Sequence, residues 1–122
     1  MFTDTKIKSK TVPHNFGPLK NASGNARVYS SDGGFAEFWI NVQNEQIVQA
    51  AFITSNSKEC MLSCSALAEI AEGMKLSRAY SFSQNELKDY ADLKTAAGCT
   101  ENAIAALKEA ILNYQKAVTE IT

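Results

Sequence analysis

The spacing of apolar residues changes midway along the chain, and this change limits the fold more than any other feature. From Arg27 to Thr54, apolar residues either alternate with polar ones or form a run of strand length. From about residue 58, they recur every three or four positions. Alternation matches the pleat of a strand, and the longer period matches one face of an α-helix. We therefore expect strands of a sheet in the first half of the chain and helices in the second half.

Three strands are predicted in the first half. The turn-forming residues 31–34 separate the first two candidates, and the short polar segment 43–46 separates the last two. Connections this short join antiparallel neighbours. The predicted strands of this antiparallel meander lie at about 27–30, 37–42 and 47–54.

The second half predicts three helices. Asn56 with Glu59, and Ser83 with Glu86, have the three-residue spacing of a capping box. The predicted helices span about residues 58–72, 83–93 and 98–118.

Separated strands and helices predict an α+β fold, with a three-stranded antiparallel sheet packed on one face by about three helices. Residues 1–24 contain both prolines and the single histidine and show no sustained periodicity, so we expect an irregular N-terminal arm. With 122 residues, the whole chain 1–122 is expected to be a single domain.

Composition excludes several classes of function. The formal charge of −1 removes the electrostatic drive for binding nucleic acid or anionic membranes. No apolar run has the length of a membrane span, and the first residues lack the pattern of a secretory signal, so a cytoplasmic location is expected. The sequence contains no nucleophile elbow, nucleotide-binding glycine loop or paired catalytic carboxylates, and we expect no enzymatic activity.

The three cysteines are the main candidates for chemistry, because an odd number disfavours a closed disulfide framework. Cys60 and Cys64 lie one turn apart on the first predicted helix, and Cys99 begins the last one. Thiolates near helix N-termini suit zinc and iron–sulfur centres. Asp32 and His14 are the distinctive candidates for a further ligand.

Each of these residues also has a purely structural interpretation. Cys64 falls on the apolar stripe of its helix, which favours a buried core thiol. His14 lies beside a proline, where a solvated or capping role competes with ligation. Trp39 is expected opposite the apolar face of its strand, covered by the arm or exposed for a binding partner.

The order of several segments is similar to that of a known family. These segments are Asn15–Leu19 with Asn21–Ala22, Glu37–Val42, Ile47–Thr54, Ser65 with Glu69–Met74, and Cys99 leading into Ala106–Tyr114. The chain resembles, over about residues 14–118, the N-terminal scaffold domain of NifU and its IscU relatives, on which iron–sulfur clusters are assembled. The resemblance implies a SufE/NifU-like fold and a cysteine desulfurase or another assembly protein as partner, with the chain a monomer or a weak homo-oligomer.

The family holds its cluster with three cysteines, and this chain departs from that pattern at two of them. Asp32 and Ser57 stand at the first two positions, and Cys99 keeps the third. Two outcomes remain open. Cys60 can replace the second ligand, so that Asp32, Cys60 and Cys99 surround one metal with Cys64 as a weaker candidate, or the site is lost.

Three functions follow from these alternatives. The first is a divergent scaffold or accessory protein of iron–sulfur assembly that binds an iron–sulfur cluster or zinc. The second is an interaction module of the same fold without metal. The third is a sulfur acceptor that works through a single thiol.

Overall fold

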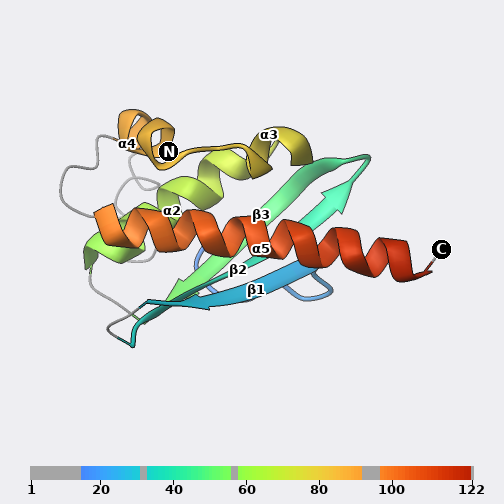
Figure 1. Ribbon diagram of the computed structural model, residues 1–122, viewed down its shortest axis with the longest axis horizontal. Helices are drawn as coiled ribbons and strands as arrows, with labels where there is room; N and C mark the ends of the chain where they lie inside the picture. The colour runs from blue at the N-terminus through green and yellow to red at the C-terminus, as the bar shows by residue number, and fades with distance from the viewer. Residues whose placement is uncertain (1–14, 31–32, 56–57, 92–96, 122) are drawn as a thin grey trace, which may run out of the picture.

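The computed structural model describes residues 15–30, 33–55, 58–91 and 97–121, apart from the side chains at 58–59, 88–91, 97–99 and 120–121. Strands come first along this part of the chain and helices follow, which confirms the predicted α+β fold (Figure 1). The strands are β1 (Gly24–Tyr29), β2 (Phe35–Gln43) and β3 (Gln46–Thr54), and the helices are α2 (Lys58–Ala71), α3 (Leu76–Tyr80), α4 (Gln84–Ala91) and α5 (Ala97–Ile121).

The strands form one antiparallel sheet in the order β1-β2-β3. Phe38 lies opposite Phe52, and Ile40 lies opposite Ala50, so alternate residues of neighbouring strands share one apolar face. Both phenylalanines are fully buried, with ring centroids 6.1 Å apart. Trp39 is next to Phe38 in the strand and therefore lies on the other face, as its position in the alternation predicts.

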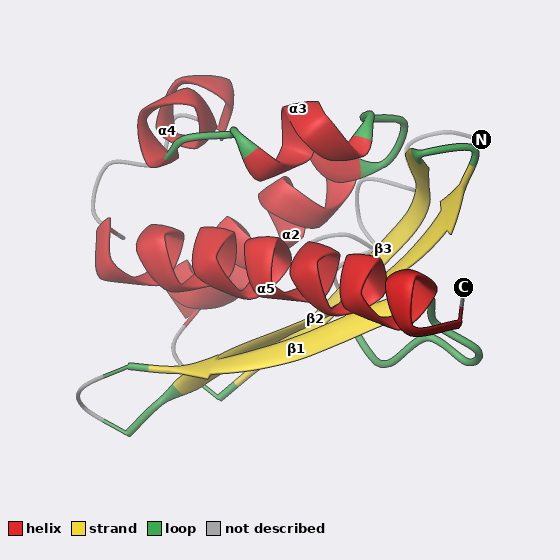
Figure 2. Cartoon of the chain, turned by 45° about the vertical axis from the view of Figure 1, so that its right-hand side comes forward, coloured by secondary structure: helices red, strands yellow, loops and turns green. Residues whose placement is uncertain are grey.

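The helices cover only the apolar face of the sheet (Figure 2). Helix α5 packs on β1 and β2, while α2 packs on β3 and against α5. The contact between β1 and α5 is close at Gly24, where an added Cβ would lie 2.9 Å from the Cβ of Tyr114 and would also meet the carbonyl oxygen of Ala110. Glycine therefore allows the strand and the helix to approach.

The turn between β2 and β3 is tied to the connection between α2 and α3. Asn44 and Glu45 have positive φ angles of 54° and 63°, as expected for a two-residue hairpin turn. The amide of Ile47 donates to the carbonyl of Met74 at 2.8 Å. The amide of Leu76 donates to the carbonyl of Glu45 at 3.0 Å. Backbone hydrogen bonds thus join two connections that are distant in sequence.

The outer edge of β3 is covered by the described end of the arm and by Glu72. The amide of Gly17 donates to the carbonyl of Phe52 at 2.8 Å. The carboxylate of Glu72 accepts from the Ala50 amide at 3.1 Å and from the Asn15 side chain at 3.3 Å. These contacts satisfy strand groups that would otherwise be open to pairing with another chain.

The helices differ from the prediction in one respect. The structure adds the five-residue helix α3, which is too short to produce a detectable apolar period. The capping box at α4 is confirmed, because the Glu86 amide donates to Ser83 Oγ at 3.2 Å and the Ser83 amide donates to Glu86 Oε1 at 2.9 Å. The other predicted box begins at Asn56, which lies outside the described residues.

In the described part of the chain, none of the helices combines the length and the apolar character needed to cross a membrane.

Candidate functional site

Three structural elements that carry candidate ligands lie at the same end of the molecule. These are the bend between β1 and β2, the junction between β3 and α2, and the first turn of α5, which lie at the left of Figure 1. The bend is closed by two backbone hydrogen bonds, from the Ser30 amide to the Gly34 carbonyl at 2.9 Å and from the Gly33 amide to the Ser30 carbonyl at 3.0 Å. Gly33 adopts a φ of 94°, which favours glycine.

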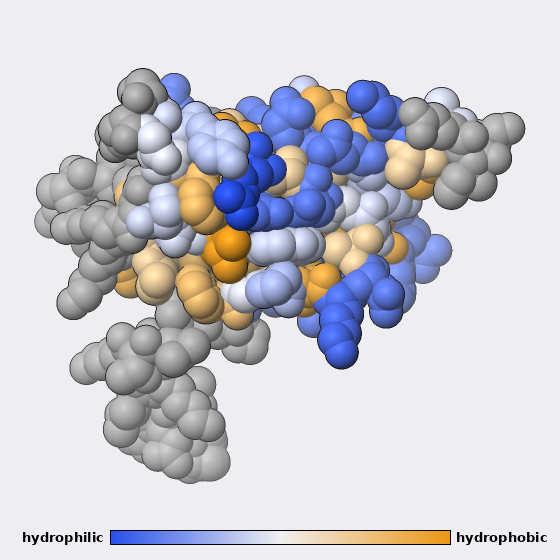
Figure 3. All heavy atoms as spheres, turned by 90° about the horizontal axis from the view of Figure 1, so that it is seen from below, coloured by the Kyte–Doolittle hydropathy of each residue, from blue (hydrophilic) through white to orange (hydrophobic). Residues whose placement is uncertain are grey.

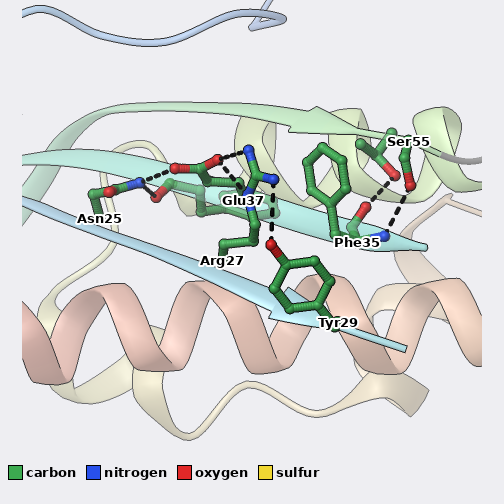
Figure 4. Close-up of polar contacts among 8 residues, drawn as sticks. Asn25, Arg27, Tyr29, Phe35, Glu37 and Ser55 are labelled. Carbon is green, nitrogen blue, oxygen red and sulfur yellow. Dashed lines mark hydrogen bonds and ion pairs between the residues drawn. The ribbon is translucent and has the colours of Figure 1, made fainter. Parts of the chain in front are cut away.

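Side-chain hydroxyls attach the bend to the junction (Figure 4). The Phe35 amide, directly after the bend, donates to Ser55 Oγ at 2.9 Å, and Thr54 Oγ1 donates to the Phe35 carbonyl at 2.9 Å. Thr54 is the last residue of β3, and Ser55 directly follows it on the way to α2. The start of β2 and the approach to α2 are therefore held together.

A further hydroxyl contact joins the second turn of α2 to the first turn of α5. Ser63 Oγ and Thr100 Oγ1 lie 3.5 Å apart, and both residues are completely buried. Thr100 directly follows Cys99, and Ser63 lies three residues after Cys60, one turn along the same helix face. The structure therefore brings the helix segments that contain these two cysteines side by side.

The cysteines of α2 differ in state. Cys64 is 1% exposed, belongs to the hydrophobic core and is a free thiol. Burial raises the pKa of the Cys64 thiol to about 12, so it carries almost no thiolate near neutral pH. The expected core thiol is confirmed. Cys60 is 4% exposed and is disulfide-bonded.

Other predicted ligands fall outside the residues that the structure describes. Asp32, His14 and Ser57 are not described, and for Cys99 only the backbone, within α5, is described. Among the described residues no group of three His, Cys, Asp or Glu side chains is placed to hold a metal ion. The predicted set of Asp32, Cys60 and Cys99 therefore stays a prediction.

An ion pair flanked by aromatic rings on the outer sheet face was not predicted from the sequence. Arg27 Nη2 lies 2.8 Å from Glu37 Oε1, and the guanidinium carbon lies 3.8 Å from the centre of the Phe35 ring (Figure 4). The Tyr29 ring, which is exposed, lies on the same side at 5.9 Å. The alternation of Arg27 with Val28 and of Glu37 with Phe38 is the signal that could have revealed the pair.

A groove also lies beside the first half of α5. It has a volume of about 370 Å³ and is lined by Phe82, Ser83, Glu101, Ile104 and Lys108, among others. It combines an apolar floor with one charge of each sign, and it does not include the cysteines. In the view of Figure 3, apolar residues on the described surface occur in small groups among polar ones.

The fold and the candidate site define a class of protein: a small α+β domain with cysteines near the starts of two helices that pack together. The NifU-like N terminal domain family matches residues 2–120, and the chain belongs to this family. No curated protein matched the chain in sequence.

Solved structures share the fold at low sequence identity. The N-terminal part of a nitrogen-fixing NifU-like protein from Brucella abortus is 14% identical, with a TM-score of 0.67 over 89% of this chain and 90% of that one. A protein from Fervidobacterium islandicum AW-1, assigned as an iron–sulfur cluster assembly scaffold of the SUF system, is 14% identical, with a TM-score of 0.64 over 86% and 92%. A hypothetical protein is 19% identical, with a TM-score of 0.68 over 90% and 96%.

Proposed function

We propose that this chain takes part in iron–sulfur cluster assembly as a metal-binding or accessory scaffold rather than as an enzyme. The observation that carries this proposal is the family match, which extends over residues 2–120. The similarity to a SUF-system scaffold supports it at the level of fold. A cysteine desulfurase is the partner that such a role requires.

The proposed ligands are Asp32, Cys60 and Cys99, which would hold iron, zinc or a cluster as cargo. Two thiolates suit soft or borderline metals, while the carboxylate adds a hard oxygen. The contacts at Ser55 and at Ser63 support this set, because they hold together the three elements from which these ligands come. Cys64 is excluded from the first choice because it is buried in the core and almost fully protonated.

Anaerobic reconstitution tests this function. The full chain is first reduced with a dithiol and then incubated with ferrous iron and sulfide, and bound iron and visible charge-transfer absorbance are measured. We expect both signals in the natural sequence and in Cys64→Ala. We expect their loss in Cys99→Ser and in Cys60→Ser, because a hydroxyl is a poor ligand for these metals.

The matched pair of variants makes the result specific. Cys60 and Cys64 lie on the same helix and are both buried, so a general effect of helix damage should reduce binding in both variants. The absence of both bound iron and visible absorbance in the reduced natural chain would refute the binding of iron or a cluster. Sedimentation velocity of the chain mixed with a cysteine desulfurase measures whether the two bind, and this tests the partner separately.

A second function is favoured by the outer face of the sheet. Tyr29 is 64% exposed and lies beside the Arg27–Glu37 pair, which suits an interaction module that contacts a partner without metal. This alternative predicts that Tyr29→Ala weakens desulfurase binding while Cys99→Ser leaves it intact. The opposite pattern would reject it.

A further inference from the structure

The disulfide state of the cysteines carries an inference about regulation of the proposed site. Cys60 is disulfide-bonded, Cys64 is a free thiol, and the sequence contains one other cysteine, Cys99. We infer that Cys60 and Cys99 form a reversible disulfide within the chain, and that this disulfide determines whether the proposed metal-binding thiols are available. This inference concerns the regulation of the proposed metal site, and its gating part rests on that proposed function.

The described neighbours of the two cysteines place their helix segments in contact. Cys60, Ser63, Cys64 and Leu67 follow the spacing of one helix face, and all four are buried. Ser63 on this face contacts Thr100, the residue after Cys99, with 3.5 Å between the two hydroxyl oxygens. The face of α2 that carries Cys60 is therefore the face turned toward the first turn of α5.

Cys64 does not compete in this exchange. An intruding thiol must act as a thiolate to attack a disulfide, and Cys64 is a core residue that is 1% exposed. Its raised pKa, about 12 because of burial, leaves very little thiolate near neutral pH. The two remaining cysteines can therefore form and break their bond without rearrangement to the third.

The chemistry is a two-electron step. On oxidation, the thiols of Cys60 and Cys99 lose two protons and two electrons to a disulfide oxidant such as oxidised glutathione, which is reduced to two thiols, and an S–S bond forms. A dithiol such as dithiothreitol reverses the step: its own two thiols become a disulfide, and both cysteine thiols are restored. A disulfide has no thiolate to offer a metal, so the oxidised form should not bind iron or zinc.

Thiol labelling of the full chain tests the disulfide directly. The chain is treated with oxidised glutathione, unfolded in denaturant with N-ethylmaleimide, digested and analysed by mass spectrometry. We expect label on Cys64 alone and a linked peptide containing Cys60 and Cys99. After treatment with dithiothreitol, we expect label on every cysteine. Because the natural sequence is used, no variant has to fold for this result.

A metal measurement tests the gate, which is the control of metal binding by the disulfide. The oxidised and reduced chains are incubated with zinc alone, and bound zinc is counted per chain after gel filtration. We expect zinc in the reduced chain and its loss in the oxidised chain, with the same pattern in Cys64→Ala as the matched control. Equal zinc in both forms would overturn the gate.

The outcomes separate this inference from the proposed function. Label on all three cysteines after oxidation, or a link between two chains seen as a dimer on a non-reducing gel, would overturn the internal disulfide even if metal binding is found. A confirmed disulfide in a chain that takes up no metal when reduced would support the pair, overturn the gate and refute the metal-binding function.

Discussion

The two ends of the sheet are held together by different kinds of contact. At the end formed by the β2–β3 turn and the α2–α3 connection, three hydrogen bonds join backbone groups, as between Ile47 and Met74, and one side chain, that of Gln46, donates to the Gly73 carbonyl. At the opposite end, which contains the candidate site, hydroxyl side chains form several of the hydrogen bonds between elements. Examples are those between Ser55 and Phe35 and between Ser63 and Thr100. The first kind of contact depends little on residue identity, whereas the second depends on it strongly.

This difference predicts that side chains at the candidate site can vary while the fold is kept. The backbone-linked end fixes the register of β3 and the position of α2. Side chains at the end with the candidate site can then change without disturbing the core of the sheet. Four predictions test this comparison, beginning with the largest expected effect.

Gly24→Ala should damage the β1–α5 contact beside the backbone-linked end. The new methyl group would lie 2.9 Å from Tyr114 Cβ and would meet the Ala110 carbonyl, which is part of the helix backbone and cannot move aside easily. We expect a loss of about 3 kcal/mol in the free energy of unfolding, measured by urea denaturation. Gln43→Ala, an exposed change in the neighbouring strand, is the control and should stay within about 0.5 kcal/mol. A similar small loss at Gly24 would contradict the close approach.

Gly73→Ala and Gly33→Ala compare the two ends directly. Both glycines have positive φ, 96° and 94°, and an added Cβ meets nothing within 4 Å at either position. Each change should therefore cost about 1–2 kcal/mol of unfolding free energy through backbone strain alone. Only Gly33→Ala should also lower metal uptake, because Gly33 follows Asp32. Equal loss of uptake in both variants would remove the distinction between the ends.

Ser63→Ala tests the hydroxyl contact between the helices that carry Cys60 and Cys99. Removing one partner of a buried hydrogen bond should cost about 1 kcal/mol in urea denaturation. Combined with Thr100→Val, the loss should be smaller than the sum of the two single losses, because both hydroxyls then leave together. Strictly additive losses would show that the two side chains are not coupled.

Glu86→Gln should have the smallest effect and should depend on pH. The Arg78 guanidinium, aided by the Ser83 amide, lowers the pKa of Glu86 to about 2 from an ordinary 4.5. In the unfolded chain Glu86 binds its proton at higher pH, so its stabilising contribution is complete above about pH 4.5 and is lost as the pH falls toward about 2.

Melting temperatures of Glu86→Gln and the natural chain, compared across this range at low salt, measure that contribution. The difference should be small because the pair is exposed, and it should disappear at the acidic end. Arg78→Gln should weaken the same pH dependence, because it removes the largest cause of the lowered pKa of Glu86 and leaves the hydrogen bonds from Ser83. A difference that grows as the pH falls would contradict the assignment.

Much of the fold could be predicted from local patterns. The alternation around Phe38 and Ile40 predicted β2, and the three- and four-residue steps of Ile104, Leu107 and Ile111 predicted α5. The short helix α3 was missed because five residues are too few to show a period. Residues 24–26 of β1 were missed because strand pairing and the contact with α5 place them, and their own sequence has no strand pattern.

The candidate site could be predicted only in part. The helix stripe correctly indicated that Cys64 is a core thiol. The disulfide bond of Cys60 had no local signal, since its spacing from Cys64 pointed to a shared face and an odd number of cysteines argued against a disulfide framework. The Arg27–Glu37 pair was also missed, because it depends on cross-strand register.

The sequence by itself determined the class of elements, their order and the apolar face of each, because these depend on residues within a few positions of one another. Only the tertiary structure decided which helix segments lie side by side and that Cys60 is disulfide-bonded. These outcomes depend on contacts between residues far apart in the chain, such as Ser63 and Thr100, whose encounter is set by packing on the sheet.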